Sequence, residues 1–98
     1  MRNNNSESAY GGSLPYELIA GKVDLVYFKL LISISSVTNY KMRKTLEDIL
    51  VHGISRKLAC IKNNVSQSSV SLKIQHLQYV NQTVHMMHQY YKHKELKN

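Results

Sequence analysis

Apolar residues recur at three- and four-residue steps through most of the chain, the spacing that places them on one face of an α-helix. The first such segment covers residues 25–34 and follows Asp24, a residue type that caps helix N-termini. A second covers residues 40–51 and ends before Gly53, which readily takes the left-handed conformation that closes a helix. Most charged residues of this second segment, including Asp48, are expected on its solvent side.

The second half of the chain predicts further helices around a tight turn. A short helix should cover residues 56–61, and Asn63 with Asn64 should form the turn, because Asn tolerates the positive φ that such a turn requires. Residues 67–91 carry one apolar stripe, along either a single helix or two helices separated by a bend. The stripe consists of Val70, Ile74, Leu77, Val80, Val84, Met87 and Tyr91. The expected N-caps are Asp24, Thr38 or Asn39, Ser55 and Ser66.

No strand-like alternation persists beyond a few residues, and no proline follows Pro15. The predicted fold class is therefore all-α, a small helical domain of about five helices. Within it, residues from about 55 to 77 should form a helix-turn-helix. A chain of 98 residues has room for one domain with one modest core.

The predicted helix-turn-helix meets the packing requirements of two helices that cross at a steep angle. Such a pair needs a small side chain at the crossing, a turn residue of positive φ and apolar residues that close the wedge. The residues that fill these roles are Cys60, Asn64, Val65, Val70, Ile74 and Leu77. Polar Asn63 occupies the position before the turn, where such hairpins usually carry a bulky apolar residue. This suggests a turn one residue longer than usual. Helix hairpins of this kind also occur in proteins that bind no nucleic acid.

The net charge of +7 lies entirely in the part of the chain that contains this hairpin. Residues 1–38 carry three basic and three acidic groups, whereas residues 39–98 carry ten basic and three acidic groups. Such an excess favours a polyanionic partner, because each phosphate that Lys or Arg neutralises releases condensed counterions. A basic surface without any partner is the alternative interpretation.

If the hairpin binds DNA, its basic residues should contact phosphates and the start of its second helix should face the bases. The second helix offers short donors and acceptors there, and Gln pairs well with adenine. The sequence contains no strong Arg-to-guanine pattern, so shape, A·T richness and repetition of the site should matter most. The predicted DNA-binding residues are Arg56, Lys57, Lys62, Ser66, Gln67, Ser68, Ser69, Ser71 and Lys73.

These observations divide the chain into three parts. Residues 1–13 are polar and rich in Asn and Ser, and we expect a flexible N-terminal tail. Residues 14–92 should form the helical DNA-binding domain, and residues 93–98 a basic C-terminal tail.

Other chemistries find little support in the sequence. Five histidines, with His85 and His88 on one helix face, lack the further well-spaced ligands that a zinc site needs, so no metal and no cofactor are expected. No catalytic triad, paired carboxylates or phosphate-binding loop can be assembled, which predicts neither an enzyme nor a small-molecule substrate. The longest apolar run, residues 25–37, is too short for a membrane span, and the N-terminus lacks an apolar export segment. We expect a cytoplasmic bacterial protein.

The C-terminal run of Met86, Met87, Tyr90 and Tyr91 places large side chains on more than one side of a helix. A contact between protomers is the favoured interpretation, which makes the protein a homo-oligomer. Ordinary core packing and stacking on single-stranded nucleic acid are the alternatives.

Several short strings resemble the PapB-like regulators (FocB/FanA group) of enterobacterial fimbrial, or adhesin, operons. The similarity covers residues 18–77. It rests on Leu18-Ile19 with Gly21-Lys22-Val23, on Leu30 to Ser35, on Leu50-Val51-His52-Gly53, and on Ser55-Arg56-Lys57 followed by Cys60.

This resemblance implies a small all-helical transcription regulator that binds A·T-rich, promoter-proximal DNA, largely through the minor groove and as several protomers. It also implies that Arg56 contacts DNA and that Cys60 maintains the binding unit. Two other functions remain open at this point, an RNA-binding regulator or antiterminator that acts on a leader transcript and a non-catalytic protein-interaction module.

Overall fold

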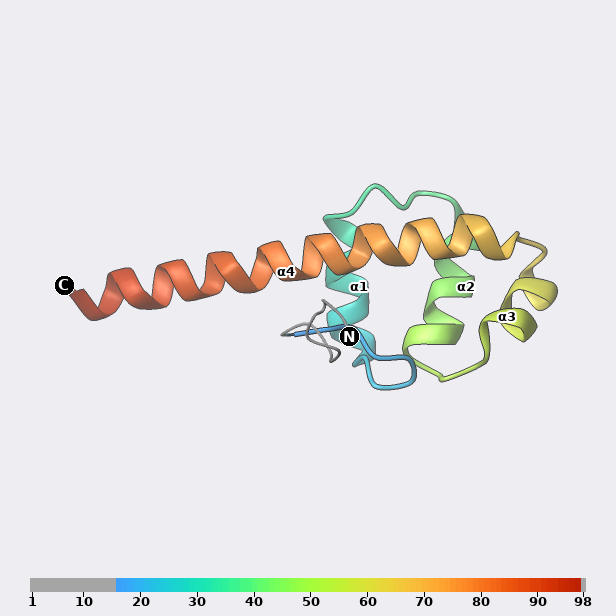
Figure 1. Ribbon diagram of the computed structural model, residues 1–98, viewed down its shortest axis with the longest axis horizontal. Helices are drawn as coiled ribbons and strands as arrows, with labels where there is room; N and C mark the ends of the chain where they lie inside the picture. The colour runs from blue at the N-terminus through green and yellow to red at the C-terminus, as the bar shows by residue number, and fades with distance from the viewer. Residues whose placement is uncertain (1–15, 98) are drawn as a thin grey trace, which may run out of the picture.

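The computed structural model describes residues 16–97, and all the regular elements in this range are helices (Figure 1). They are α1 (Leu25–Ser33), α2 (Tyr40–Leu50), α3 (Arg56–Asn63) and α4 (Gln67–Lys97). The predicted all-α class is confirmed. The described range holds four helices rather than about five, because residues 78–91 continue α4 without a break. The tail expected over residues 1–13 lies outside the described residues.

The four helices begin where the sequence predicts, because a local hydrogen bond defines each start. The side chains of Asp24, Asn39, Ser55 and Ser66 each accept a hydrogen bond from the backbone N–H three residues later, at 2.9 to 3.2 Å. Each bond satisfies one of the N–H groups that a helix start leaves without a backbone partner. Between the two expected alternatives at the start of α2, the structure therefore selects Asn39.

The hydrophobic core lies where α1, α2 and the first half of α4 meet. Phe28, Leu46, Leu50, Val70 and Leu77 are at most 2% exposed there. In Figure 1, α4 passes across α1 and α2 and then continues well beyond the body of the molecule. The first half of α4 is thus a core element and the second half a projection.

The segment before α1 crosses the end of α2 at very short range. The backbone N–H of Gly21 donates to the carbonyl of Ile49 at 3.0 Å, and that of Val23 donates to the carbonyl of Leu50 at 3.1 Å. Gly21 and Gly53 have φ angles of 76° and 73°, and a Cβ on Gly21 would lie 3.1 Å from the Cα of Gly53. Both positions therefore require glycine, and the resemblance strings Gly21-Lys22-Val23 and Leu50 to Gly53 meet at this crossing.

The apolar stripe of α4 does not continue along the core as expected. Val80 is half-buried against the core and Asn81 is 1% exposed, but Met87 and Tyr91 are 53% and 60% exposed. No described element reaches this part of α4, so the expectation that Met87 and Tyr91 belong to the inner stripe is wrong. Their periodicity reflects an amphipathic helix without a surface to cover it.

Candidate nucleic-acid interface

The hairpin between α3 and α4 turns at Asn64, which has φ 56° and ψ 52° in the left-handed region. The backbone N–H of Asn64 donates to the carbonyl of Ile61 at 3.3 Å, and that of Val65 donates to the carbonyl of Cys60 at 3.1 Å. Asn63 is the last residue of α3 rather than part of the turn, so this half of the predicted Asn63-Asn64 turn is wrong. The connection consists of residues 64–66.

The polar side chain of Asn63 has a specific partner beneath α3. Its amide donates to the carboxylate of Asp48 at 3.0 Å and to the carbonyl of Ala59 at 2.9 Å. Asp48 is 2% exposed, so its expected place on the solvent side of the second helix is wrong. The ammonium groups of Lys44 and Lys62 lie 4.0 and 3.6 Å from its two carboxylate oxygens. A buried carboxylate therefore joins α2 to the end of α3, which explains why Asn63 is not apolar.

The residues expected to close the hairpin lie on its inner side. Cys60, Val70, Ile74 and Leu77 are buried, Val65 is half-buried against them, and Asn64 is exposed at the turn. Sequence reasoning overlooked Ala59, which is fully buried at 0% exposed. Ala59 precedes Cys60 directly, so the hairpin has two adjacent small residues at its crossing.

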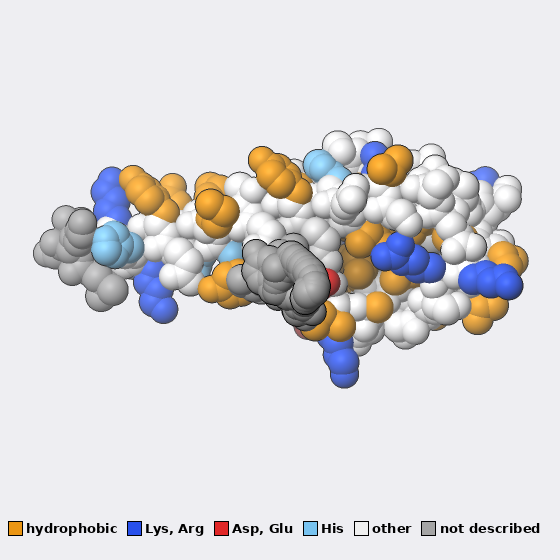
Figure 2. Space-filling view, viewed as in Figure 1, with side chains coloured by type: hydrophobic (Ala, Val, Ile, Leu, Met, Phe, Trp, Pro, Cys, Tyr) orange, Lys and Arg blue, Asp and Glu red, His pale blue; other side chains and the backbone are white. Residues whose placement is uncertain are grey.

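The predicted DNA-binding residues lie on α3, in its connection to α4 or at the start of α4, and all are exposed except Lys73, which is half-buried. The guanidinium of Arg56 donates through Nη1 to the hydroxyl of Ser71 at 2.8 Å. This bond connects the first residue of α3 with the second turn of α4. Figure 2 shows Lys and Arg side chains near the α2–α3 end of the molecule and again toward the free end of α4.

The cations of this surface differ in how much of their charge the protein itself compensates. Lys62 lies beside Asp48, whereas Arg56, Lys57 and Lys73 make no ion pair with the described side chains, those of residues 16–94. Free cations bind phosphate more strongly than paired ones, because no internal partner has to be displaced. Arg56, Lys57 and Lys73 therefore keep a positive charge that no described acidic side chain compensates.

A groove of about 390 Å³ borders this surface where the α1–α2 loop faces the beginning of α4. Its lining includes Asn39, Met42, Ser66, Ser69 and Lys73. Ser66 also donates to the hydroxyl of Ser69 at 2.7 Å, in addition to capping α4. Among the serines at the start of α4, Ser66 and Ser69 are thus partly engaged with each other.

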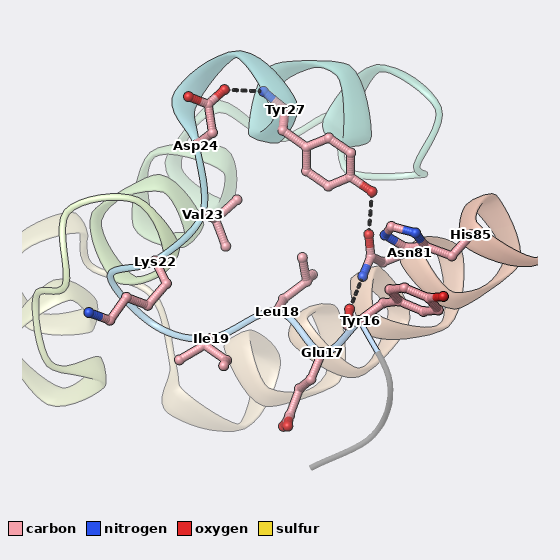
Figure 3. A pocket seen from close by; sticks show the side chains of 10 residues that line it. All are labelled: Tyr16, Glu17, Leu18, Ile19, Lys22, Val23, Asp24, Tyr27, Asn81 and His85. Carbon is pink, nitrogen blue, oxygen red and sulfur yellow. Dashed lines mark hydrogen bonds between the residues drawn. The ribbon is translucent and has the colours of Figure 1, made fainter. Parts of the chain in front are cut away.

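A second pocket, of about 280 Å³, lies on the other side of the molecule, where residues 16–24 lie against α1 and α4. The Tyr27 hydroxyl donates to the side-chain carbonyl of Asn81, and the amide of Asn81 donates to the backbone carbonyl of Tyr16 (Figure 3). The ring of His85 stacks on that of Tyr16 at 4.0 Å between centroids. Burial raises the pKa of Tyr27 above its usual value of 10.0.

This polar cluster anchors the segment before α1 onto α4. The side-chain amide of Gln78 adds to it by exchanging two hydrogen bonds, at 2.9 and 3.0 Å, with the backbone of Leu18. Sequence reasoning did not find Asn81, whose only signal was its place four residues after Leu77 on the buried face. Its partners come from parts of the chain more than 50 residues away.

Two further findings limit the chemistry of the described residues. Within residues 16–97, no three His, Cys, Asp or Glu side chains lie close enough together to hold a metal ion. None of the helices described there combines the length and apolarity that crossing a bilayer requires.

The fold and this surface define a small all-helical protein with one exposed, basic helix pair. Comparison with known proteins gives its family. Residues 1–91 match the PapB family, described as adhesin biosynthesis transcription regulatory protein. The regulatory protein FanB of Escherichia coli is 42% identical over 78 residues, which make up 80% of this chain and 79% of FanB. The crystal structure of E. coli FocB superposes with a TM-score of 0.72 at 31% identity, covering 79% of this chain and 88% of FocB.

The chain therefore belongs to the PapB family, and the resemblance seen in the sequence is confirmed. It is a transcription regulator of adhesin biosynthesis. The regulatory character of the family agrees with the expectation that the protein is not an enzyme.

Proposed function

We propose that this regulator binds A·T-rich, promoter-proximal double-stranded DNA as a homo-oligomer, through the surface of α3 and the start of α4. The observation that carries the proposal is the exposed pair of Arg56 and Ser71, which presents a cation without an acidic partner between the two helices. A guanidinium fixed in this way is well placed for a phosphate oxygen.

The residues around this pair suit positioning on DNA better than reading of individual bases. Lys57 and Lys73 supply further positive charge, and Gln67, Ser68 and Ser69 supply short polar groups at the start of α4. Serines distinguish bases poorly, and Arg56, the arginine among these residues, already donates a hydrogen bond to Ser71. Selectivity should therefore come from the shape and deformability of A·T-rich duplexes.

A titration of a fluorescent A·T-rich duplex with the purified protein, repeated at rising salt, tests this proposal. Affinity should fall steeply between 50 and 200 mM salt, as it does for about 6 phosphate contacts. Arg56→Ala should weaken binding on every sequence. Lys29→Ala is the matched control, because Lys29 is also exposed but lies on α1.

Competition with unlabelled nucleic acids separates this function from its alternatives. A single-stranded RNA that displaces the duplex at equal or lower concentration would favour action on a transcript. Binding that stays constant with salt, or an Arg56→Ala protein with unchanged affinity, contradicts the proposal and leaves a protein-interaction module.

A further inference from the structure

The solvent side of α4 carries a second periodic pattern, opposite the residues that face the core. Its positions alternate at four- and three-residue steps, which is the spacing of a coiled-coil seam. Four large members, Leu72, Tyr79, Met86 and Tyr90, are 66%, 71%, 70% and 61% exposed. The outer seam consists of Leu72, His76, Tyr79, Thr83, Met86 and Tyr90.

Tyr16 reaches α4 at His85 and Gln89, and beyond Gln89 no other described segment of the chain packs against the helix. All the described side chains from Met86 to Lys94 are exposed, and this part of the helix projects from the body in Figure 1. From residue 82 to Lys97 the helix extends for about 24 Å. Helices of this length are marginal in water without tertiary contacts, so the projection needs a partner.

We propose that a second copy of this chain covers the outer seam, with the two α4 helices packed antiparallel. This deepens the homo-oligomer that forms part of the proposed function. A two-fold axis between Val84 and His85 brings Tyr79 opposite Tyr90 of the second copy, and Thr83 opposite its Met86. The same axis pairs His76 with His93 of the second copy. Each seam residue from His76 to Tyr90 therefore faces either a seam residue of the second copy or His93, the next position of the repeat.

Charge favours this orientation over a parallel one. The outer seam contains no Lys, Arg, Asp or Glu, so two copies can face each other there without repulsion. Lys94 follows Tyr90 by four residues and lies at the edge of the seam near the free end of α4, so a parallel pair would place it beside its counterpart. In the antiparallel pair, Lys94 reaches the level of Gln75 in the second copy, which is neutral.

The surface available is enough for a specific dimer. Two tyrosines at about 150 Å² each, with Met86, Leu72 and the smaller seam residues, give roughly 600 Å² per protomer. The resulting total of about 1,200 Å² lies at the lower end of specific protein interfaces. The buried residues of α4, Val70, Ile74, Leu77 and Asn81, lie on the side of the helix opposite the seam, so the core of each copy lies on the far side of its helix from the second copy.

A charge exchange between Tyr79 and Tyr90 tests both the surface and the orientation, by sedimentation equilibrium without DNA. Tyr79→Glu alone puts a carboxylate against an aromatic ring, and Tyr90→Lys alone does the same with an ammonium. Each should raise the dimer dissociation constant at least tenfold. The Tyr79→Glu, Tyr90→Lys double variant should recover most of the affinity, because Glu of each copy then faces Lys of the other.

The two positions are about 16 Å apart within one helix, so the rescue cannot arise within a chain. A monomeric wild-type protein, or single variants that dimerise normally, would overturn the proposal. A double variant that stays monomeric would overturn the antiparallel arrangement. A dimer that forms as expected but binds no duplex refutes the proposed function alone, and circular dichroism confirms that each variant is folded.

Discussion

The guanidinium of Arg56 and the hydroxyl of Ser71 form a 2.8 Å hydrogen bond that spans the two helices of the basic hairpin. This bond fixes a long, flexible side chain on the exposed surface between α3 and α4. In the proposed DNA complex, we expect Ser71 to act as a positioning residue for Arg56.

Removing the Ser71 hydroxyl should weaken DNA binding without affecting folding. Ser71→Ala frees the Arg56 side chain, whose ordering must then be achieved on binding, and we expect a loss of affinity of about 3- to 10-fold. Ser71→Thr retains the hydroxyl and should keep most of the wild-type affinity. Duplex titration measures the effect. If Ser71→Ala costs the same in an Arg56→Ala background, the two residues act independently and the positioning role is wrong.

The carboxylate of Asp48 should contribute strongly to stability. Asp48→Ala removes one of the two acceptors of the Asn63 amide and leaves one N–H of this half-buried group without a partner, at a cost of roughly 1–3 kcal/mol. Urea unfolding followed by circular dichroism measures this loss. Asn63→Asp is the sharper companion variant, since it places a second carboxylate against a buried one and should destabilise the protein more. Equal stability of Asn63→Asp and wild type would show that this contact does not hold α3 to α2.

The crossing of Gly21 over Gly53 should tolerate no side chain at either position. Gly21→Ala introduces a Cβ 3.1 Å from the Cα of Gly53, and Gly53→Ala one at 3.4 Å from the Cα of Gly21. Both also force alanine into positive φ, which costs about 1 kcal/mol. We expect each variant to melt several degrees lower than wild type, Gly21→Ala more so, in thermal unfolding. The reverse order would indicate that conformational strain outweighs crowding.

How much of this structure the sequence predicts depends on the range of the interactions involved. The N-caps at Asp24, Ser55 and Ser66 are hydrogen bonds within three residues, so their residue types suffice to place the helix starts. Asn63 and Asp48 lie 15 residues apart and pair only after α2 and α3 have packed. Local patterns therefore treat the first as a turn residue and the second as a solvent-exposed charge.

The α4 helix shows the same limit on a larger scale. Its periodicity correctly predicts a helix through residues 67–91, but a 3.6-residue repeat does not state how far a neighbouring surface extends. The stripe therefore assigns Met87 and Tyr91 to a core that ends near Val84. The candidate DNA-binding residues, in contrast, are polar positions of one hairpin, and eight of the nine are exposed in the structure.

The raised pKa of Tyr27 gives a specific pH dependence at the alkaline end. Burial favours the neutral form of the Tyr27 phenol in the folded state. Its pKa there is therefore higher than in the unfolded state, where it is about 10. The folded state therefore binds more protons above that pH, and stability falls as pH rises. The contribution of Tyr27 is fully present below pH 10 and is lost as pH rises through its raised pKa. Urea unfolding between pH 8 and 11 measures this decline.

Tyr27→Phe separates this effect from the general alkaline loss of stability. The variant lacks the hydrogen bond to Asn81 and should be less stable at pH 8, but its stability should decline less between pH 10 and 11. Tyr40→Phe is the matched control, because Tyr40 is exposed and should leave the slope as it is in wild type. If the unfolding free energies of Tyr27→Phe and wild type change in parallel with pH, the Tyr27 phenol has the same pKa in the folded and unfolded chains. Its burial beside Asn81 would then be too small to shift that pKa.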